Sequence, residues 1–188
     1  MTSVVELWLP ILLSAIAVFL VSFLLHMVLK YHQSDVKRHP SEDEVLSAIR
    51  RTNSPPGDYV LPHATMADMN SPEYVAKRSA GPVALLTVLP GGPPAMRREL
   101  TGWFIYSLVV SIFAAYMTSR ALAGDVEYEY LDVFRFAATT AFLGYGLAQL
   151  QESIWWGRSW NTTLKNLFDA LVYGLVTGGV FGWLYPGA

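Results

Sequence analysis

The chain has 188 residues, of which 53% are hydrophobic and only 15% are charged, and its net charge is −2. Soluble domains carry about 25% charged residues, so this composition is typical of a membrane protein. The small net charge gives no reason to expect a nucleic-acid partner. The absence of cysteine from the sequence excludes disulfides, thiol nucleophiles, thiolate zinc sites and iron–sulfur clusters.

Four apolar segments are long enough to cross a bilayer, which requires about 20 residues in a helix. The first, residues 4–29, has no basic residue ahead of its apolar core and no cleavage site after it, so we expect a retained anchor and not a signal peptide. The other three carry their charges close to their ends and comprise residues 102–122, 133–156 and 166–185. The sequence therefore predicts an all-α integral membrane protein, a four-helix transmembrane bundle.

The basic residues predict how this bundle is oriented. Nine of the 13 lysines and arginines lie in the segment 30–101 and two more in the loop 157–165, whereas the loop 123–132 contains four acids and no base. Basic loops stay in the cytoplasm, so both termini face outward. Tryptophans at or just beyond the span ends agree with these spans: Trp8, Trp103, Trp155, Trp156, Trp160 and Trp183. We expect the protein to be integral to a membrane, a bacterial inner membrane.

The cytoplasmic segment 30–101 contains its own helix signals. A capping box that begins at Ser41 predicts a helix over residues 42–52. Ser71 followed by a proline at the first helical position predicts a second short helix over residues 72–79.

The apolar stretch 83–89 is far too short to cross a bilayer, and Pro82 and Pro90 prevent it from extending as a helix. We expect an extended cytoplasmic segment that packs on its own loop or on the bundle. Two alternatives are a re-entrant loop and a docking strip for a partner protein. The candidate docking residues are Val83, Leu85, Leu86, Val88 and Leu89.

Four ionisable side chains fall near the cytoplasmic ends of the spans: His26, Glu99, Glu152 and Asp169. Together they suit a proton relay or a divalent-ion site. The alternative, which we favour, is structural pairing with neighbouring bases, for example of Asp169 with Lys165 one turn away. In either case we expect at least two of the four to come within reach of Arg158, Lys165 or one another.

Small residues predict close helix contacts in two spans. Gly174, Gly178 and Gly182 recur every four residues in the fourth span, the small-xxx-small pattern that lets two helices approach. Ser107 and Ser111 form a weaker version in the second span. The pattern does not distinguish a contact inside the bundle from one between subunits.

Catalytic signatures are lacking in the sequence, which contains no P-loop, no dinucleotide fingerprint and no HExxH motif. The histidines of the long loop, His32, His39 and His63, lack helical ligand spacing, so we expect no catalytic residue, metal site or cofactor.

Three functions remain open. The first, which we favour, is a non-catalytic accessory or self-assembling subunit whose partners are the lipid bilayer and other membrane subunits or itself. The second is a small ion- or proton-coupled transporter or channel that uses the polar cluster. The third is a membrane enzyme that acts on lipid, for which the same polar groups would have to line a cleft.

Overall fold

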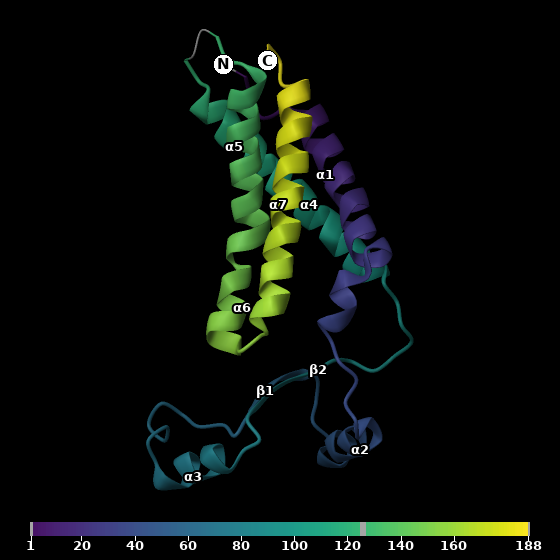
Figure 1. The fold of residues 1–188 in the computed structure, drawn as a ribbon, viewed down its shortest axis with the longest axis vertical. Coiled ribbons are helices and arrows are strands. Elements are labelled where there is room, and N and C mark those ends of the chain that lie inside the picture. The colour runs from purple at the N-terminus through teal and green to yellow at the C-terminus, as the bar shows by residue number, and fades with distance from the viewer. Residues whose placement is uncertain (1, 125–126, 188) are drawn as a thin grey trace. The chain divides into compact units, whose positions relative to one another are not determined.

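The computed structural model describes residues 2–124 and 127–187, and this part of the chain is mostly helical. It divides into two compact units (Figure 1). We call residues 37–94 the hairpin unit and the rest of the chain the helical bundle.

Three helices of the bundle are long and apolar enough to cross a membrane, among the residues that the structure describes. The first is α1 (Trp8–Phe23), which continues without interruption through a π-helical turn, Leu24–Val28. The others are α4 (Arg97–Ala121) and α7 (Trp160–Leu184), each 25 residues long. The expectation of membrane-length helices is thus confirmed for three of the four segments.

The expected third span, residues 133–156, is not one continuous helix. It consists of α5 (Tyr130–Phe142), a π-helical turn (Leu143–Leu147) and α6 (Gln149–Trp156). Two glycines in the π-helical turn lower its helix propensity, and their missing side chains leave room for close neighbours. A Cβ atom at Gly144 would lie 3.1 Å from Val110, and one at Gly146 would lie 3.0 Å from the Cβ atom of Ala170.

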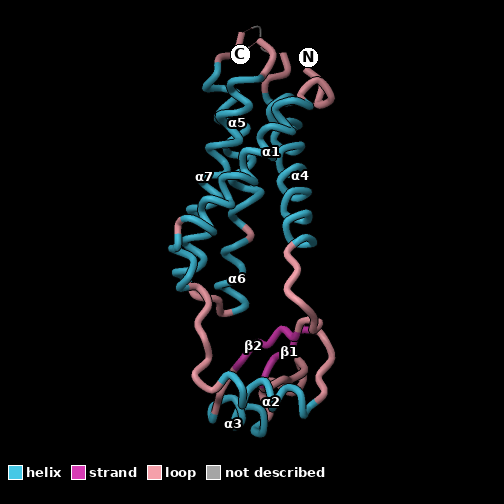
Figure 2. The backbone as a smooth tube through the Cα atoms, turned by 90° about the vertical axis from the view of Figure 1, so that its right-hand side faces the viewer, coloured by secondary structure: helices cyan, strands magenta, loops and turns pink. Residues whose placement is uncertain are grey.

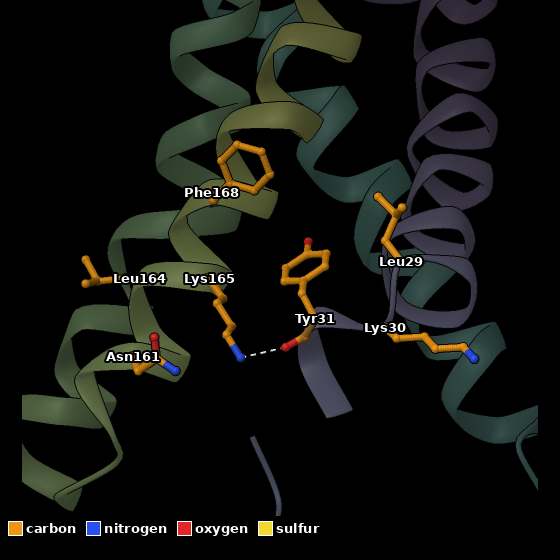
Figure 3. A pocket seen from close by; sticks show the side chains of 7 residues that line it. All are labelled: Leu29, Lys30, Tyr31, Asn161, Leu164, Lys165 and Phe168. Atoms are coloured by element: carbon orange, nitrogen blue, oxygen red, sulfur yellow. Dashed lines mark hydrogen bonds between the residues drawn. The ribbon is translucent and has the colours of Figure 1, made fainter. Parts of the chain in front are cut away.

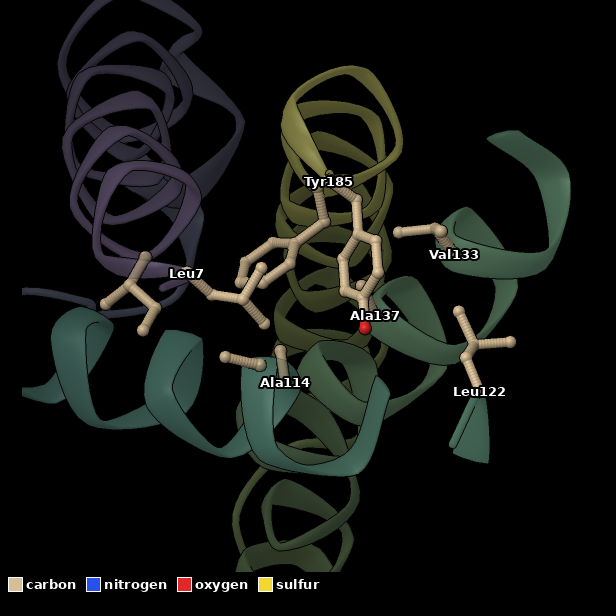
Figure 4. Packing of buried hydrophobic residues seen from close by; sticks show 9 residues of the cluster. Leu7, Ala114, Leu122, Val133, Ala137 and Tyr185 are labelled. Carbon is tan, nitrogen blue, oxygen red and sulfur yellow. The ribbon is translucent and has the colours of Figure 1, made fainter. Parts of the chain in front are cut away.

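The interior of the bundle has two apolar clusters. α5 packs along α7, and α1 packs against both α4 and α7. The cluster in Figure 4 includes Leu7 of the N-terminal turn, Ala137 of α5 and Tyr185 at the end of α7. The second cluster includes Val18 and Tyr145 and lies farther from the two chain termini than the first. Many large apolar side chains of the same helices remain exposed, which is the arrangement expected where lipid covers the outer surface.

The glycine ridge of α7 lies against α5. A Cβ atom at Gly178 would lie 2.6 Å from the Cβ atom of Ala138 and 2.9 Å from the carbonyl oxygen of Phe134. One at Gly174 would lie 2.9 Å from the carbonyl oxygen of Ala138, and one at Gly182 would lie 2.7 Å from the ring of Tyr130. The ridge therefore makes its close contact inside the chain.

The weaker ridge of α4 is also internal. Ser107 and Ser111 are fully buried, and the Ser14 hydroxyl of α1 donates a hydrogen bond to Ser111 Oγ at 3.0 Å. This polar contact joins α1 to α4 in the middle of the bundle.

The hairpin unit contains the two expected helices, α2 (Glu42–Thr52) and α3 (Pro72–Ala80). The Ser71 hydroxyl accepts the predicted capping bond from the Tyr74 amide at 3.2 Å. The Ser41 side chain makes no capping bond, so the predicted capping box is wrong although the helix that follows it forms.

The expected all-α class is also wrong for this unit, because it contains a two-stranded antiparallel sheet (Figure 2). Strand β2 (Ala84–Val88) is the core of the apolar stretch 83–89 and pairs with β1 (Gly57–Leu61). The prolines on either side were a sufficient signal for an extended segment, but its partner strand was not predicted. Three of the candidate docking residues, Val83, Leu85 and Leu89, are exposed, and Leu86 and Val88 are half-buried.

Gly178→Ala is predicted to lower the free energy of unfolding by about 1 to 3 kcal/mol, because its Cβ atom overpacks the contact with α5. Gly179→Ala is the matched control, since its Cβ atom would meet only the Tyr130 hydroxyl at 3.9 Å. That control should be neutral or slightly stabilising because alanine is the better helix former. Thermal unfolding of both variants in detergent tests the contact, and equal stability of the two would show that α5 and α7 do not meet at this ridge.

Candidate functional site

The end of α1 brings two histidines together. After the π-helical turn, Leu29 adopts an extended conformation and the chain continues as a short 3-10 helix, Lys30–Ser34. This change of direction places the ring of His32 on the ring of His26, with centroids 4.4 Å apart and planes 3° apart. Two imidazoles that are six residues apart in the sequence are therefore neighbours in space.

Both histidines face the carboxylate of Asp169 on α7, a residue that is only 3% exposed. His32 Nε2 lies 2.8 Å from Asp169 Oδ2, and His26 Nε2 lies 3.7 Å from the same oxygen. The second carboxylate oxygen, Oδ1, accepts a short hydrogen bond from the Tyr31 hydroxyl. Two imidazoles and one phenol from the segment that follows α1 thus surround one buried carboxylate.

The outer nitrogens of both rings are fixed by acceptors. His26 Nδ1 lies 3.0 Å from the Ser22 carbonyl oxygen, and His32 Nδ1 lies 2.6 Å from Asp35 Oδ2. Carbonyl and carboxylate oxygens only accept, so we assign the proton to Nδ1 in both rings. This tautomer leaves Nε2 of each ring with a lone pair on the side of Asp169, and only His32 Nε2 is within hydrogen-bond distance of it.

Lys165, one turn before Asp169, does not pair with it. Its ammonium donates to Asp35 Oδ1 at 2.6 Å, to the Tyr31 carbonyl oxygen at 2.6 Å and to Ser34 Oγ at 2.8 Å. Figure 3 shows Lys165 reaching from α7 to the Tyr31 backbone. The predicted pairing of Lys165 with Asp169 is therefore wrong, because the 3-10 helix supplies Lys165 with its own carboxylate.

Burial and charge shift the titration of two groups in the 3-10 segment. Burial would raise the pKa of the Asp35 carboxyl, but hydrogen bonds from Lys165 and His32 outweigh it and hold the pKa below its ordinary value. Burial, followed by the adjacent Asp169 carboxylate, raises the pKa of the Tyr31 phenol. Tyr31 therefore stays a neutral donor to Asp169, and Asp35 stays a charged acceptor for His32 and Lys165.

The contact between His32 Nε2 and Asp169 Oδ2 requires a positive centre. With Nδ1 protonated toward Asp35, both facing atoms carry lone pairs and would repel each other at 2.8 Å. A proton or a metal ion between them removes the repulsion. The same geometry that fixes the tautomer therefore leaves room at this contact for either a proton or a metal ion.

The three facing groups have the spacing of metal ligands. One ligand atom each from His26, His32 and Asp169 lies within 4.8 Å of the others. Nitrogen and oxygen ligands at 2.0 to 2.2 Å from one ion are roughly 3 Å apart, between the two nitrogen–oxygen distances found here. Histidine ligands in metal sites usually donate their other N–H to a carboxylate or a carbonyl, as these two do.

A cavity of about 660 Å³ lies beside these ligands, between α1, α4 and α7. His26 and Asp169 form part of its wall. The side chains of Trp103 on α4, Tyr145 in the second π-helical turn and Tyr173 on α7 line its inner part. An ion held by the three ligands would therefore have one side open to a cavity.

The structure brings together only two of the four predicted polar residues. His26 and Asp169 come within 3.7 Å, which confirms the expected approach of at least two of them. Glu99 is exposed in the first turn of α4 and Glu152 is half-buried in α6. Neither carboxylate makes a hydrogen bond or ion pair with the part of the chain that the structure describes, and neither belongs to the cluster.

Sequence reasoning missed three members of the cluster: Tyr31, His32 and Asp35. They were assigned to a loop because the apolar run stops at Leu29. The available signal was the concentration of a phenol, an imidazole and a carboxylate within six residues of the end of an apolar span, since polar groups near a membrane need partners.

No family model matches this chain, and neither a curated protein nor a solved structure is detectably similar to it. The chemistry of the site therefore has to be argued from its own geometry.

Lys165→Met is predicted to cost about 3 kcal/mol of unfolding free energy, because it leaves a largely buried Asp35 without its ammonium partner. Arg135→Met is the control within the same bundle, since the Arg135–Asp132 pair is long, at 3.5 Å, and exposed. Removing such a pair should cost less than about 1 kcal/mol. Chemical unfolding in detergent measures both, and a Lys165 variant as stable as the control would contradict the described network.

Proposed function

We propose that this protein is a four-helix integral membrane protein that binds a divalent transition-metal ion through His26, His32 and Asp169. The main support is the 2.8 Å contact between His32 Nε2 and a buried carboxylate, in a ring whose Nδ1 is already committed to Asp35. Such a pair needs a proton or a metal ion between its facing atoms, and the third ligand atom within reach favours the metal ion.

The ligand set favours ions of the zinc and iron class. Two imidazoles and one carboxylate suit Zn²⁺, Fe²⁺, Co²⁺ or Ni²⁺, whereas Ca²⁺ and Mg²⁺ prefer oxygen ligands alone. Three protein ligands with one open side are typical of catalytic or exchangeable sites, since structural zinc sites are closed by four protein ligands. This distinction favours a protein that uses or moves the ion over one in which the ion only supports the fold.

The fourth membrane crossing is part of the proposal. α5, the second π-helical turn and α6 all pack on α7, which is long enough to span a bilayer. If α7 crosses, its close partner along the glycine ridge lies in the bilayer as well. The distribution of basic residues then assigns the metal site to the cytoplasmic side and both termini to the outer side.

The accessory-subunit hypothesis loses one of its supports and keeps another. The glycine ridge is occupied by α5 and is not free to join a second subunit. The hairpin unit, however, has no buried residue anywhere in positions 37–94, all of which are described. A unit without a core is typical of a segment that is completed by a partner, so a docking role for this unit remains the second candidate function.

Metal titration tests the proposed site directly. The purified protein should bind Co²⁺ with a visible d–d spectrum and Zn²⁺ in competition with it. His26→Ala and His32→Ala should each weaken binding by at least about 100-fold, and Asp35→Asn by about 10- to 100-fold, since it orients His32 without binding the ion.

The matched control for the metal titration is His63→Ala, a histidine of the hairpin unit that should leave the affinity unchanged. Equal binding by the parent and the His32 variant would overturn the proposal, as would the absence of binding to the parent at micromolar Co²⁺.

The topology is tested by single cysteines in this cysteine-free chain. Ala67→Cys and Asn161→Cys should react with an impermeant thiol reagent only from the cytoplasmic side, and Glu127→Cys only from the outer side, because charged loops follow the positive-inside rule. All three positions are exposed. Labelling of positions 127 and 161 from the same side would show that the interrupted segment does not cross.

A further inference from the structure

The cavity beside the proposed metal site contains buried donors that no side chain of the described residues satisfies. The hydroxyl oxygens of Tyr145 and Tyr173 have no hydrogen-bond partner, although the two residues are only 5% and 4% exposed. Ser107 lies close to the Tyr145 hydroxyl but not in hydrogen-bond geometry with it, so Tyr173 is the stronger case of an unpartnered donor. Buried phenols normally have a partner, because leaving one unsatisfied costs about 1 to 3 kcal/mol.

Both phenols line the same cavity. Their rings pack in a T-shaped contact with centroids 5.4 Å apart, and Trp103 packs beside both of them. The faces and edges of the rings therefore contact one another, and the hydroxyl groups are the parts of the two tyrosines that can bind a ligand. A cluster packed in this way provides hydrogen-bond donors, not an open aromatic cage for an ammonium group.

The other polar side chains that line the cavity also favour a ligand group that accepts hydrogen bonds. Arg158 lies on the wall, together with the amide side chains of Gln149 and Asn166. The carboxylate of Asp169 opposes a negative ligand, but a divalent ion bound there would reverse the sign of the charge at that end. The preferred ligand group is therefore an anionic oxygen.

The outer lining of the cavity is apolar and exposed. Phe23 and Met27 come from the end of α1, and Met96 and Leu100 from the start of α4. These four side chains would face the hydrocarbon if α1 and α4 cross the bilayer. The cavity therefore changes from an apolar outer part to a buried inner part with hydroxyl donors.

We infer that this cavity binds a membrane lipid with an anionic head group, phosphate or carboxylate, whose head lies at Tyr145, Tyr173 and the metal site and whose chain leaves between α1 and α4. The volume of about 660 Å³ is within the range of ligand pockets. The inference rests on the proposed function, since the bound ion supplies the positive charge beside Asp169.

The test uses four probes on the purified full chain in a neutral detergent. Oleoyl lysophosphatidate combines chain and phosphate, monooleoylglycerol has the chain without the charge, oleylamine has the opposite charge, and inorganic phosphate has no chain. Binding is measured by native mass spectrometry and by titration, with Zn²⁺ and with a chelator. Lysophosphatidate should bind at least about 10-fold more tightly than each of the other three, as a charged hydrogen bond predicts.

Tyr173→Phe and Tyr145→Phe are the decisive variants, because each removes one hydroxyl that has no partner in the described part of the chain and should not lower stability. Each should weaken lysophosphatidate binding by about 10-fold. The control is Tyr116→Phe, an exposed residue outside the cavity lining. Unchanged affinity in both cavity variants, or tighter binding of oleylamine or of free phosphate, would overturn the inference.

The two proposals fail in different ways. Zn²⁺ binding without tyrosine-dependent lipid binding would leave the metal site standing and refute the lipid site. Lipid binding that depends on Tyr173 but not on Zn²⁺, in a protein that binds no metal, would refute the metal site and the part of the inference that rests on it, and would support only the contact of the lipid head with the phenols.

Discussion

The buried carboxylate of Asp169 is the constraint on which this end of the bundle depends. An isolated charge in an apolar helix bundle would cost several kcal/mol, so the chain has to bring partners to it. α7 itself does not provide them, because its nearest base, Lys165, makes its hydrogen bonds to other groups. The partners come from the polar segment after α1, which turns back toward α7 directly after Leu29.

Two carboxylates and two nitrogen groups form one connected network as a result. Lys165 bonds Asp35, Asp35 bonds His32, and His32 faces Asp169. Each group in this series limits the choices of the next, because the ammonium fixes the carboxylate and the carboxylate fixes the tautomer of the ring. An isolated surface ion pair would not fix the orientation of its two side chains in this way. The network therefore orients His32 in advance, which would lower the cost of assembling the proposed metal site.

Hydropathy was sufficient to predict three of the bundle helices because the capacity to cross a bilayer depends on composition over about 20 residues. It located the C-terminal ends of α4 and α7 to within one residue but placed their starts five and six residues late, and the glycine spacing identified the face of α7 that meets α5. It could not locate His32, because the approach to Asp169 depends on one extended residue, Leu29, that no periodic pattern marks. The β1–β2 pairing was missed for the related reason that contacts between short exposed strands leave little alternation in the sequence.

The two π-helical turns explain how an otherwise regular bundle holds a polar site. One extra residue in a helical turn rotates all that follows by about 100°, and such turns are frequent at functional sites. The turn Leu24–Val28 carries His26, and the turn Leu143–Leu147 carries Tyr145. Both residues line the same cavity from different helices. Close packing also explains the glycine in the second turn. A side chain at Gly146 would crowd Ala170, the neighbour of Asp169 in the sequence. The departures from regular helix therefore coincide with the residues proposed to bind the metal ion and the lipid head.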